Sequence, residues 1–283
     1  MTSSVTVVKC GGGPSLDLEA ICRDVAALTR ADQPVVLVHG GSGELDRLAD
    51  RLGVPQRRMT TPSGSSSRYT DPATLEVLLM ALVGKVKPGL VAGLARHGAS
   101  AVGLTGMDHR LLVARRTATH RAVLDGRTVL IRDDHNGRIQ SVDPTIVRLL
   151  VDAGITPVIS PPALGEDGGP VNVDADRAAA AVAAALATPT CRTTLILLTA
   201  APGVLADPGD ESSLRSEVAL AATGPVLPEA VGGMTVKLQA ARDALRGGVT
   251  RVLVADGRRP APVTDALAGA GTSITTELVG SHR

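Results

Sequence analysis

Lysine is rare in this chain, and two of its few lysines stand beside glycine-rich turns. Arginine supplies 25 of the 29 basic side chains, and the four lysines are Lys9, Lys85, Lys87 and Lys237. Lys9 ends an apolar run and precedes three glycines, whereas Lys237 follows two glycines and opens a helical pattern. Glycines let backbone N–H groups approach an anion, and a compact ammonium adds a point charge. These two lysines are therefore candidates for handling a phosphate group, and solvated surface lysines are the alternative.

Short runs of Val, Ile and Leu alternate with longer helical patterns along the chain. Expected strands cover residues 5–8, 35–38, 101–104, 157–159, 194–198 and 251–254. Expected helices cover residues 16–29, 44–51, 72–96, 145–153, 175–187 and 236–246. This βαβ series predicts an α/β fold: an open, doubly wound, mainly parallel sheet sandwiched between helices.

Residues 111–142 break this rhythm. They contain two apolar runs and the turn pair Asp125-Gly126, which together predict a β-hairpin excursion. Pro161-Pro162 and residues 165–170 form the best linker candidate. We therefore expect two lobes, residues 1–170 with the hairpin and residues 171–283.

Four glycine-bearing turns follow expected strands. They are Gly11-Gly12-Gly13, Gly40-Gly41, residues 103–106 and Gly203. In a doubly wound sheet these turns emerge at the carboxyl edge of the strands, where ligands bind. None has the spacing of a Walker P-loop or of a dinucleotide-binding fingerprint. Four turns at one edge, with Lys9 beside the first, indicate an anion site there.

A polar segment, Asn172-Val173-Asp174-Ala175-Asp176, stands directly before the alanine-rich helix. Its period of two places Asn172, Asp174 and Asp176 on one side of an extended segment. Helix N-capping by Asp174 or Asp176 would explain one acid. A substrate-binding amide together with a carboxylate that fixes the lysines would explain the others. Both interpretations stay open on these residues.

Two further side chains have a possible chemical role. Arg68 could hold a carboxylate bidentately, although a lone surface arginine is the commoner explanation. His39 could act as an acid or base, yet a histidine at a strand end is more often structural. The sequence shows no histidine pair with metal spacing and no Ser-His-Asp arrangement, so we expect no metal held by side chains.

Composition excludes several classes of protein. A net charge of +1, with no Phe, no Trp and one Tyr, argues against a nucleic-acid partner. Three cysteines without CxxC spacing fit a reducing cytoplasm. The first residues lack a basic signal region, and the longest apolar run, residues 178–187, is about half of a membrane span. We expect a soluble, cytoplasmic protein without a membrane partner.

Taken in order, the motifs resemble the amino acid kinase superfamily. Within it they are similar to the acetylglutamate kinase family, and most of all to its LysW-type branch, whose aminoadipate is borne on an amino-group carrier protein. The matching motifs are Val8-Lys9-Cys10-Gly11-Gly12, Val38-His39-Gly40-Gly41, Arg68-Tyr69-Thr70-Asp71, Val102-Gly103-Leu104-Thr105-Gly106, Asn172-Val173-Asp174-Ala175-Asp176 and Gly233-Met234-Thr235-Val236-Lys237. They cover nearly the whole chain.

The resemblance implies the roles of individual residues. Lys9 and Lys237 would neutralise the transferred phosphoryl group, and Asp176 would hold both ammonium groups. Acceptor binding would fall to Gly40, Gly41, Arg68 and Asn172. Nucleotide binding would fall to Gly11, Gly12, Thr199, Gly203 and Met234.

The resemblance also implies ATP and Mg²⁺ as cofactors, an acyl phosphate as product and a homodimer. The first lobe would bind the acceptor and dimerise, and the second lobe would bind ATP. Phosphoryl transfer to a carboxylate depends on alignment and charge neutralisation, and it needs no general base. This weakens the case for His39 as a catalytic group.

Two features favour an acceptor borne on an acidic carrier protein. Asp174 stands where acetylglutamate kinases usually have Asn. The carrier-linked branch resembles this chain in having the Asn-x-Asp-x-Asp form. Residues 110–132 hold six arginines against Asp125, a net charge of +5, which suits an acidic partner. Arg115, Arg116 and Arg121 are the candidate carrier contacts, and a solvated hairpin is the alternative.

Two rival functions remain at this stage. The chain could phosphorylate free N-acetylglutamate. It could instead be a catalytically weak, amino-acid-sensing regulator, because Ala200 stands where the family carries an acid near the nucleotide.

Overall fold

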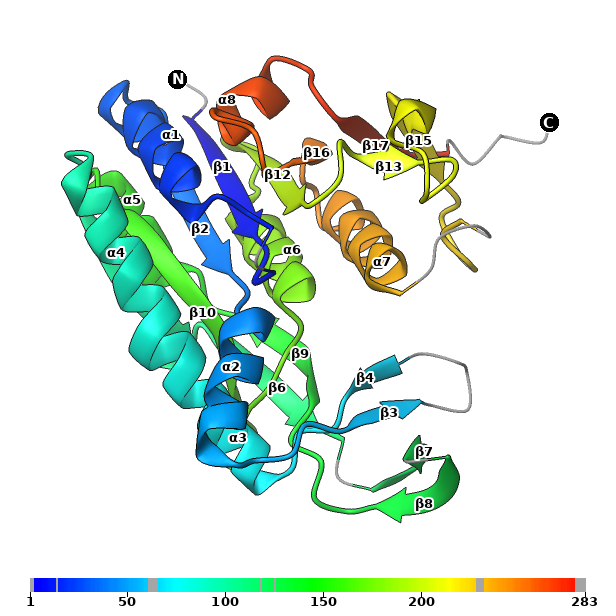
Figure 1. Cartoon of the computed structure of the whole chain (residues 1–283). Helices are drawn as coiled ribbons and strands as arrows, with labels where there is room; N and C mark the ends of the chain where they lie inside the picture. The colour runs from blue at the N-terminus through cyan, green and yellow to red at the C-terminus, as the bar shows by residue number, and fades with distance from the viewer. Residues whose placement is uncertain are drawn as a thin grey trace.

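One mainly parallel sheet runs through the molecule (Figure 1). The structure is a computed structural model that describes residues 3–13, 15–60, 66–117, 119–124, 126–227 and 232–277. The strands of this sheet are β1 (Ser3–Cys10), β2 (Val35–His39), β5 (Ala101–Gly106), β6 (Leu112–Arg116), β9 (Gly137–Val142), β10 (Thr156–Gly165), β11 (Pro170–Val171), β12 (Cys191–Thr199), β15 (Glu217–Leu220), β16 (Arg251–Asp256) and β17 (Thr272–Thr276). Their order is β15-β17-β16-β12-β1-β2-β10-β6-β9, and β5 and β11 also pair with β10. Only β6–β9, β10–β11 and β16–β17 are antiparallel among the described pairs of this sheet.

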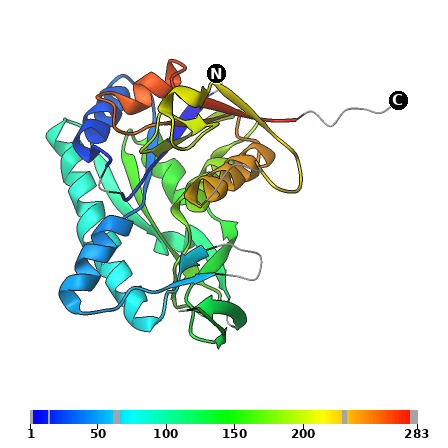
Figure 2. The same cartoon turned by 45° about the vertical axis from the view of Figure 1, so that its right-hand side comes forward.

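Helices cover both faces of the sheet, which confirms the predicted fold class. They are α1 (Leu18–Arg30), α2 (Ser42–Leu52), α3 (Pro72–Ala81), α4 (Lys87–Arg96), α5 (Thr145–Asp152), α6 (Ala175–Leu186), α7 (Gly233–Arg246) and α8 (Pro262–Leu267). One apolar layer joins α1, α4 and α8 to the sheet, and the other joins α5, α6 and α7 to it. Figure 2, turned from the first view, keeps α6 and α7 together on their side of the sheet.

The central strands are continuous apolar runs because both of their faces are buried. In β1, Val7 belongs to the α6 layer and Val8 to the α1 layer; in β2, Val36 and Leu37 divide in the same way. Cys10 lies in the α1 layer and is fully buried. Burial raises the pKa of its thiol to about 12, so Cys10 is a small core residue rather than a nucleophile.

A second, four-stranded sheet projects from the β6–β9 end of the main sheet (Figure 1). Its order is β4 (Ser66–Arg68), β3 (Arg58–Thr60), β7 (His120–Leu124) and β8 (Arg127–Ile131). We call it the lid sheet. A small core of Met59, Tyr69, Ala122 and Ile131 holds it together. The expected hairpin of residues 111–142 is therefore confirmed only in part, because its outer strands β6 and β9 belong to the main sheet. Asp125, at the expected turn, lies outside the described residues.

The linker expected at Pro161-Pro162 is wrong, because both prolines are buried in strand β10. This strand pairs with β5 up to Ser160 and with β11 from Ala163 onward. The prolines lie where the strand changes neighbours, so their missing N–H groups interrupt no ladder. Of the expected linker residues 165–170, Gly165 ends β10, Pro170 begins β11, and residues 166–169 form the turn between these strands. The lobe boundary near residue 170 stays a prediction, since the main sheet is continuous across it.

The long helical segment Pro72–Arg96 contains a π-helical turn, η1 (Leu82–Val86), between α3 and α4. By length and composition alone it is the one helix among the described residues that could cross a membrane, with 39% of its most apolar window buried. Core helices of soluble proteins pass the same test. The expected absence of a membrane partner stays a prediction.

The glycine turns after β1 and β2 interlock. A Cβ on Gly12 would lie 2.0 Å from the Gly41 nitrogen, and one on Gly41 would lie 2.7 Å from Leu82 Cδ2 in the π-helical turn. Gly43 N donates to Gly12 O at 2.9 Å. The expected turn at residues 103–106 is wrong, however, because β5 continues to Gly106.

We predict that Gly12→Ala lowers the free energy of unfolding by about 1–3 kcal/mol or more. The new methyl group would meet backbone atoms rather than a flexible side chain. Gly13→Ala is the matched control, since nothing lies within 4 Å of its added Cβ. Urea denaturation of both variants checks this. Equal stability of the two would contradict the close contact of the turns.

Candidate active site

Two buried lysines share one carboxylate oxygen at the carboxyl edge of the main sheet. Lys9 Nζ, at the end of β1, lies 3.0 Å from Asp176 Oδ1. Lys237 Nζ, in α7, lies 2.8 Å from the same oxygen. Figure 1 shows α6, which carries Asp176, beside α7 and the end of β1. The structure thus brings together the three predicted catalytic residues from three separate elements, and we call them the ion cluster.

Electrostatics within the ion cluster favour the charged forms of Asp176 and Lys9. Burial works against the charged form of Asp176, but Lys9 and Lys237 outweigh it and hold the pKa of this carboxyl below its usual range. Burial also opposes charge on Lys9, yet Asp176 raises its pKa above the ordinary value. Burial and the neighbouring Lys9 lower the pKa of Lys237. Together they outweigh Asp176, which raises it. Two ammonium groups contact one carboxylate, so these three groups together carry an excess positive charge suited to an incoming anion. The neighbouring Asp174 carboxyl also acts on both lysines and reduces this excess when it is ionised.

The two acids before and in α6 have different functions. Asp174 is the N-cap of α6, and its side chain accepts from Arg177 N at 3.0 Å. Burial and the nearby Asp176 raise the pKa of Asp174. Asp176, in the first turn, binds the lysines instead. The capping interpretation therefore holds for Asp174, and Asp176 contacts both lysines as the other interpretation expects. The substrate-binding role of the Asn172 amide stays a prediction.

His39 is a structural residue. It is fully buried, and its ring joins Gly40 O and Ser160 Oγ, each at 2.8 Å. Because the carbonyl can only accept, Nδ1–H donates to it and Nε2 accepts from the serine. Burial lowers the pKa of His39 to about 4, so the ring is neutral near pH 7.

Not every predicted backbone donor is free. Gly40 N donates to Cys10 O at 2.9 Å, which leaves no proton of this amide for an anion. The amides of Gly11, Gly12 and Gly41 stay candidates. Gly203 has a packing explanation, because a Cβ there would lie 2.5 Å from Thr272 Oγ1.

The two predicted acceptor-binding side chains are already engaged with other residues. Arg68 Nη2, in the lid sheet, lies 2.7 Å from Asp46 Oδ1 of α2. Asn172 Nδ2 donates to Asn136 Oδ1 at 2.8 Å. Sequence reasoning missed Asp46, which no motif marks, and Asn136. The signal for Asn136 was its rarity, since Asn136 and Asn172 are the chain's only asparagines.

The three candidate carrier contacts differ in their surroundings. Arg115 forms a bidentate pair with Glu166, with N–O distances of 3.0 and 3.1 Å. Arg116 Nε donates to Asp134 O at 2.9 Å, which connects β6 to the loop between β8 and β9. Arg121 is exposed on β7, and no ion pair links it to another described residue. Arg115 is thus neutralised by an acid and the Arg116 guanidinium is used within the protein, whereas among the described residues Arg121 has neither kind of contact.

The predicted nucleotide-binding half contains a group of charged side chains that sequence reasoning missed. Thr199, at the end of β12, pairs with Asp256 at the end of β16. Arg258 lies 2.7 Å from both Asp256 Oδ2 and Glu211 Oε1. Met234 lies half-buried in the first turn of α7. Carboxylates therefore stand at this edge even though position 200 is alanine.

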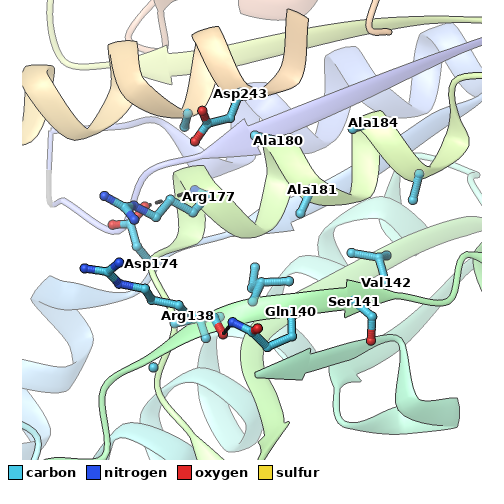
Figure 3. Close-up of a pocket in the computed structure, with 15 residues that line it drawn as sticks. Arg138, Gln140, Ser141, Val142, Asp174, Arg177, Ala180, Ala181, Ala184 and Asp243 are labelled. Atoms are coloured by element: carbon cyan, nitrogen blue, oxygen red, sulfur yellow. Dashed lines mark hydrogen bonds between the residues drawn. The ribbon is translucent and has the colours of Figure 1, made fainter. Parts of the chain in front are cut away.

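A groove of about 520 Å³ runs between β9, α6 and α7 and reaches Asp174 at one end (Figure 3). Alanines of α6 line its floor, and Arg138 and Arg177 lie at its rim. Lys9 and Lys237 do not line it, so it lies beside the ion cluster rather than over it. Among the described residues, no group of three or more His, Cys, Asp or Glu could hold a metal ion.

Comparison with known proteins gives the family. Residues 4–256 match the model of the amino acid kinase family. The chain belongs to that family. The predicted resemblance and enzyme class, a phosphotransferase acting on a carboxyl group, are thereby confirmed.

Individual relatives agree with this assignment. The chain is 42% identical over 272 residues to a LysW-aminoadipate kinase of Deinococcus radiodurans, covering 96% of this chain and 92% of the relative. It is 38% identical to an acetylglutamate kinase of Frankia casuarinae, covering 90% and 67%. Its fold matches N-acetylglutamate synthase of Neisseria gonorrhoeae with a TM-score of 0.74 and 26% identity, covering 98% of this chain and 60% of that one.

We predict that turnover falls on the alkaline side with a midpoint below pH 10.5, the ordinary lysine pKa. The ammonium of Lys237 is present below its lowered folded pKa and is lost as pH rises through it. A pH–rate profile checks this, and the midpoint belongs to the coupled ion cluster rather than to one residue.

The control for this profile is Lys85→Arg, which changes an exposed lysine paired with Glu44 and should leave the alkaline limb in place. A limb at or above pH 10.5 in the wild type would contradict the lowered pKa of Lys237.

Proposed function

We propose that this amino acid kinase transfers the γ-phosphoryl group of ATP to the side-chain carboxylate of an aminoadipate, or glutamate-like, unit borne on a small acidic carrier protein. The product is an acyl phosphate in lysine-type or related amino acid biosynthesis. The observation that carries the proposal is the ion cluster, in which two buried ammonium groups meet on one carboxylate oxygen. Its excess positive charge fits a reaction between two anions.

The chemistry follows from that charge. An acceptor carboxylate oxygen forms a bond to the γ-phosphorus while the bond from this phosphorus to the bridging oxygen breaks, and ADP leaves with the electron pair. The carboxylate is already ionised near pH 7, so no base is needed. Lys9 and Lys237 offset the repulsion between the reacting anions, and Asp176 keeps both ammonium groups in place. Mg²⁺, carried by the nucleotide, would neutralise further phosphate charge.

The backbone at Gly12 and Gly41 fits a phosphate. A Cβ on Gly12 would collide with the Gly41 backbone and one on Gly41 with the Leu82 side chain, so close packing requires both glycines. Their backbone N–H groups are the donors proposed for the anion. In this proposal Gly11 and Gly12 serve the nucleotide with Thr199, Gly203 and Met234, and Gly41 serves the acceptor with Arg68 and Asn172. A homodimer, a cytoplasmic location and an ATP-binding second lobe belong to the same proposal.

The carrier-borne acceptor is favoured over a free one by two observations. A relative named for LysW-aminoadipate matches at 42% identity, above the acetylglutamate kinase at 38%. Arg121 adds an unpaired charge on the lid sheet. Phosphorylation of free N-acetylglutamate is the second candidate, supported by that second relative. A regulator without catalysis would not need the intact ion cluster.

We predict that the purified protein, with ATP and Mg²⁺, forms a hydroxamate-trapped acyl phosphate from carrier-linked aminoadipate. N-acetylaminoadipate and N-acetylglutamate are assayed in parallel. Lys237→Ala should lower turnover by orders of magnitude, since it removes transition-state charge neutralisation. Retained turnover in Lys237→Ala would refute the mechanism, and a signal with free N-acetylglutamate alone would support the second candidate.

We further predict that Arg121→Glu raises KM for the carrier-linked acceptor about tenfold at low salt and leaves KM for ATP unchanged. Arg192→Glu is the matched control. It makes the same charge change at an exposed arginine near the amino end of β12, opposite the carboxyl edge that holds the ion cluster. Equal KM values for the two variants would remove Arg121 from the carrier surface.

A further inference from the structure

The only two asparagines of the chain lie in hydrogen-bond contact. Asn136 precedes β9, and Asn172 precedes α6. Their backbones are also joined, because Gly137 N donates to Asn172 O at 2.9 Å and Asn172 N donates to His135 O at 2.8 Å. The two carboxamides are therefore held against each other by main chain as well as side chain.

A buried carboxylate sets the direction of the first carboxamide. Asp134, 1% exposed, accepts at Oδ1 from Asn136 N at 3.2 Å and from Asn136 Nδ2 at 2.8 Å. The second proton of Asn136 Nδ2 goes to Arg68 O at 2.7 Å. Arg68 O can only accept, and Asp134 Oδ1 already accepts from two backbone N–H groups, those of Asn136 and of Thr70 at 3.3 Å, so neither atom donates to Asn136. Asn136 must therefore direct Oδ1 away from them, and a flipped carboxamide would lose both bonds.

The orientation of the Asn136 carboxamide in turn fixes that of the Asn172 carboxamide. Asn136 Oδ1 accepts from Asn172 Nδ2 at 2.8 Å and from Thr70 Oγ1 at 3.0 Å. Since the hydroxyl proton of Thr70 is used in this way, its oxygen accepts the other proton of Asn172 Nδ2 at 3.0 Å. Both protons of the Asn172 carboxamide are then used. Within the described part of the chain, no hydrogen bond reaches Asn172 Oδ1.

We infer that Asn136, anchored by Asp134, is a positioning residue that makes Asn172 present a carbonyl oxygen to the acceptor. This inference rests on the proposed function, because it takes Asn172 to contact the acceptor. A carbonyl oxygen binds an N–H donor and repels an oxygen. The site therefore selects acceptors whose α-substituent is joined through an amide N–H over those joined through an ester oxygen.

The test compares two acceptors of the same shape: N-acetylaminoadipate and the O-acetyl ester of 2-hydroxyadipate. The wild type should prefer the amide at least about tenfold in kcat/KM, because the ester leaves the partly buried carbonyl oxygen of Asn172 unpaired. In Asn136→Leu the Asn172 carboxamide is free to turn, so the preference should fall to less than about threefold. Both acceptors are measured on the same folded protein, so a change in stability cancels from the ratio.

Gln140→Leu is the matched control, since it removes an exposed carboxamide on β9 and should keep the wild-type preference. Thr70→Val is a second test variant, for use if Asn136→Leu does not fold. Valine is close to threonine in shape but removes the acceptor of one Asn172 Nδ2 proton, so the amide preference should fall part-way. An unchanged preference in either folded variant would overturn the positioning role while leaving the proposed function intact. Calorimetry follows binding of both acceptors. If the wild type neither binds nor turns over these small acceptors, the same amide and ester pair is presented on the carrier protein. No turnover and no binding with the carrier-linked pair as well would overturn both proposals together.

Discussion

Two positive charges converge on a single carboxylate oxygen, and most of the fold can be understood as the means of holding them there. Lys9 ends a strand, Lys237 lies in a helix and Asp176 lies in the first turn of another helix. Each would be costly to bury alone, because desolvation disfavours an isolated charge. Together they remain ionised inside the protein. The same arrangement is incompletely neutralised, and this leaves it ready for phosphate.

The surrounding architecture keeps these three residues close. Alanines give α6 a narrow buried face, so it can lie near both β1 and α7. Asp174 ends the extended segment and starts α6 at a defined residue, which sets the position of Asp176 two residues later. The helix N-terminus further favours a carboxylate in its first turn. A core without Phe or Trp is thus compatible with a well-defined site, because small and branched side chains fill the layers on both sides of the sheet.

How far the sequence predicts this structure depends on the element. Strands β1, β2 and β12 were predictable because burial on both faces requires an uninterrupted apolar run. Strands β3 and β4 were not, since each is three residues long and partly exposed. The prolines of β10 look like a linker until the change of strand partners is known. In the site, residue types and motif order identified Lys9, Lys237 and Asp176. The pairing of Arg115 with Glu166 and the contact between the two asparagines depend on tertiary packing, which no local pattern contains.

The lid sheet contains the chain's only aromatic side chain. Tyr69 lies in the lid core, donates its hydroxyl proton to Asp133 and has the Arg57 guanidinium 4.7 Å from its ring centre. Because the chain has no tryptophan and no phenylalanine, all of its intrinsic ultraviolet fluorescence arises from this one phenol, next to Arg68 and Thr70. The protein therefore carries a built-in optical probe at the lid, free of background from the rest of the chain. Its emission can therefore report a change in the surroundings of Tyr69 on ligand binding without any attached dye.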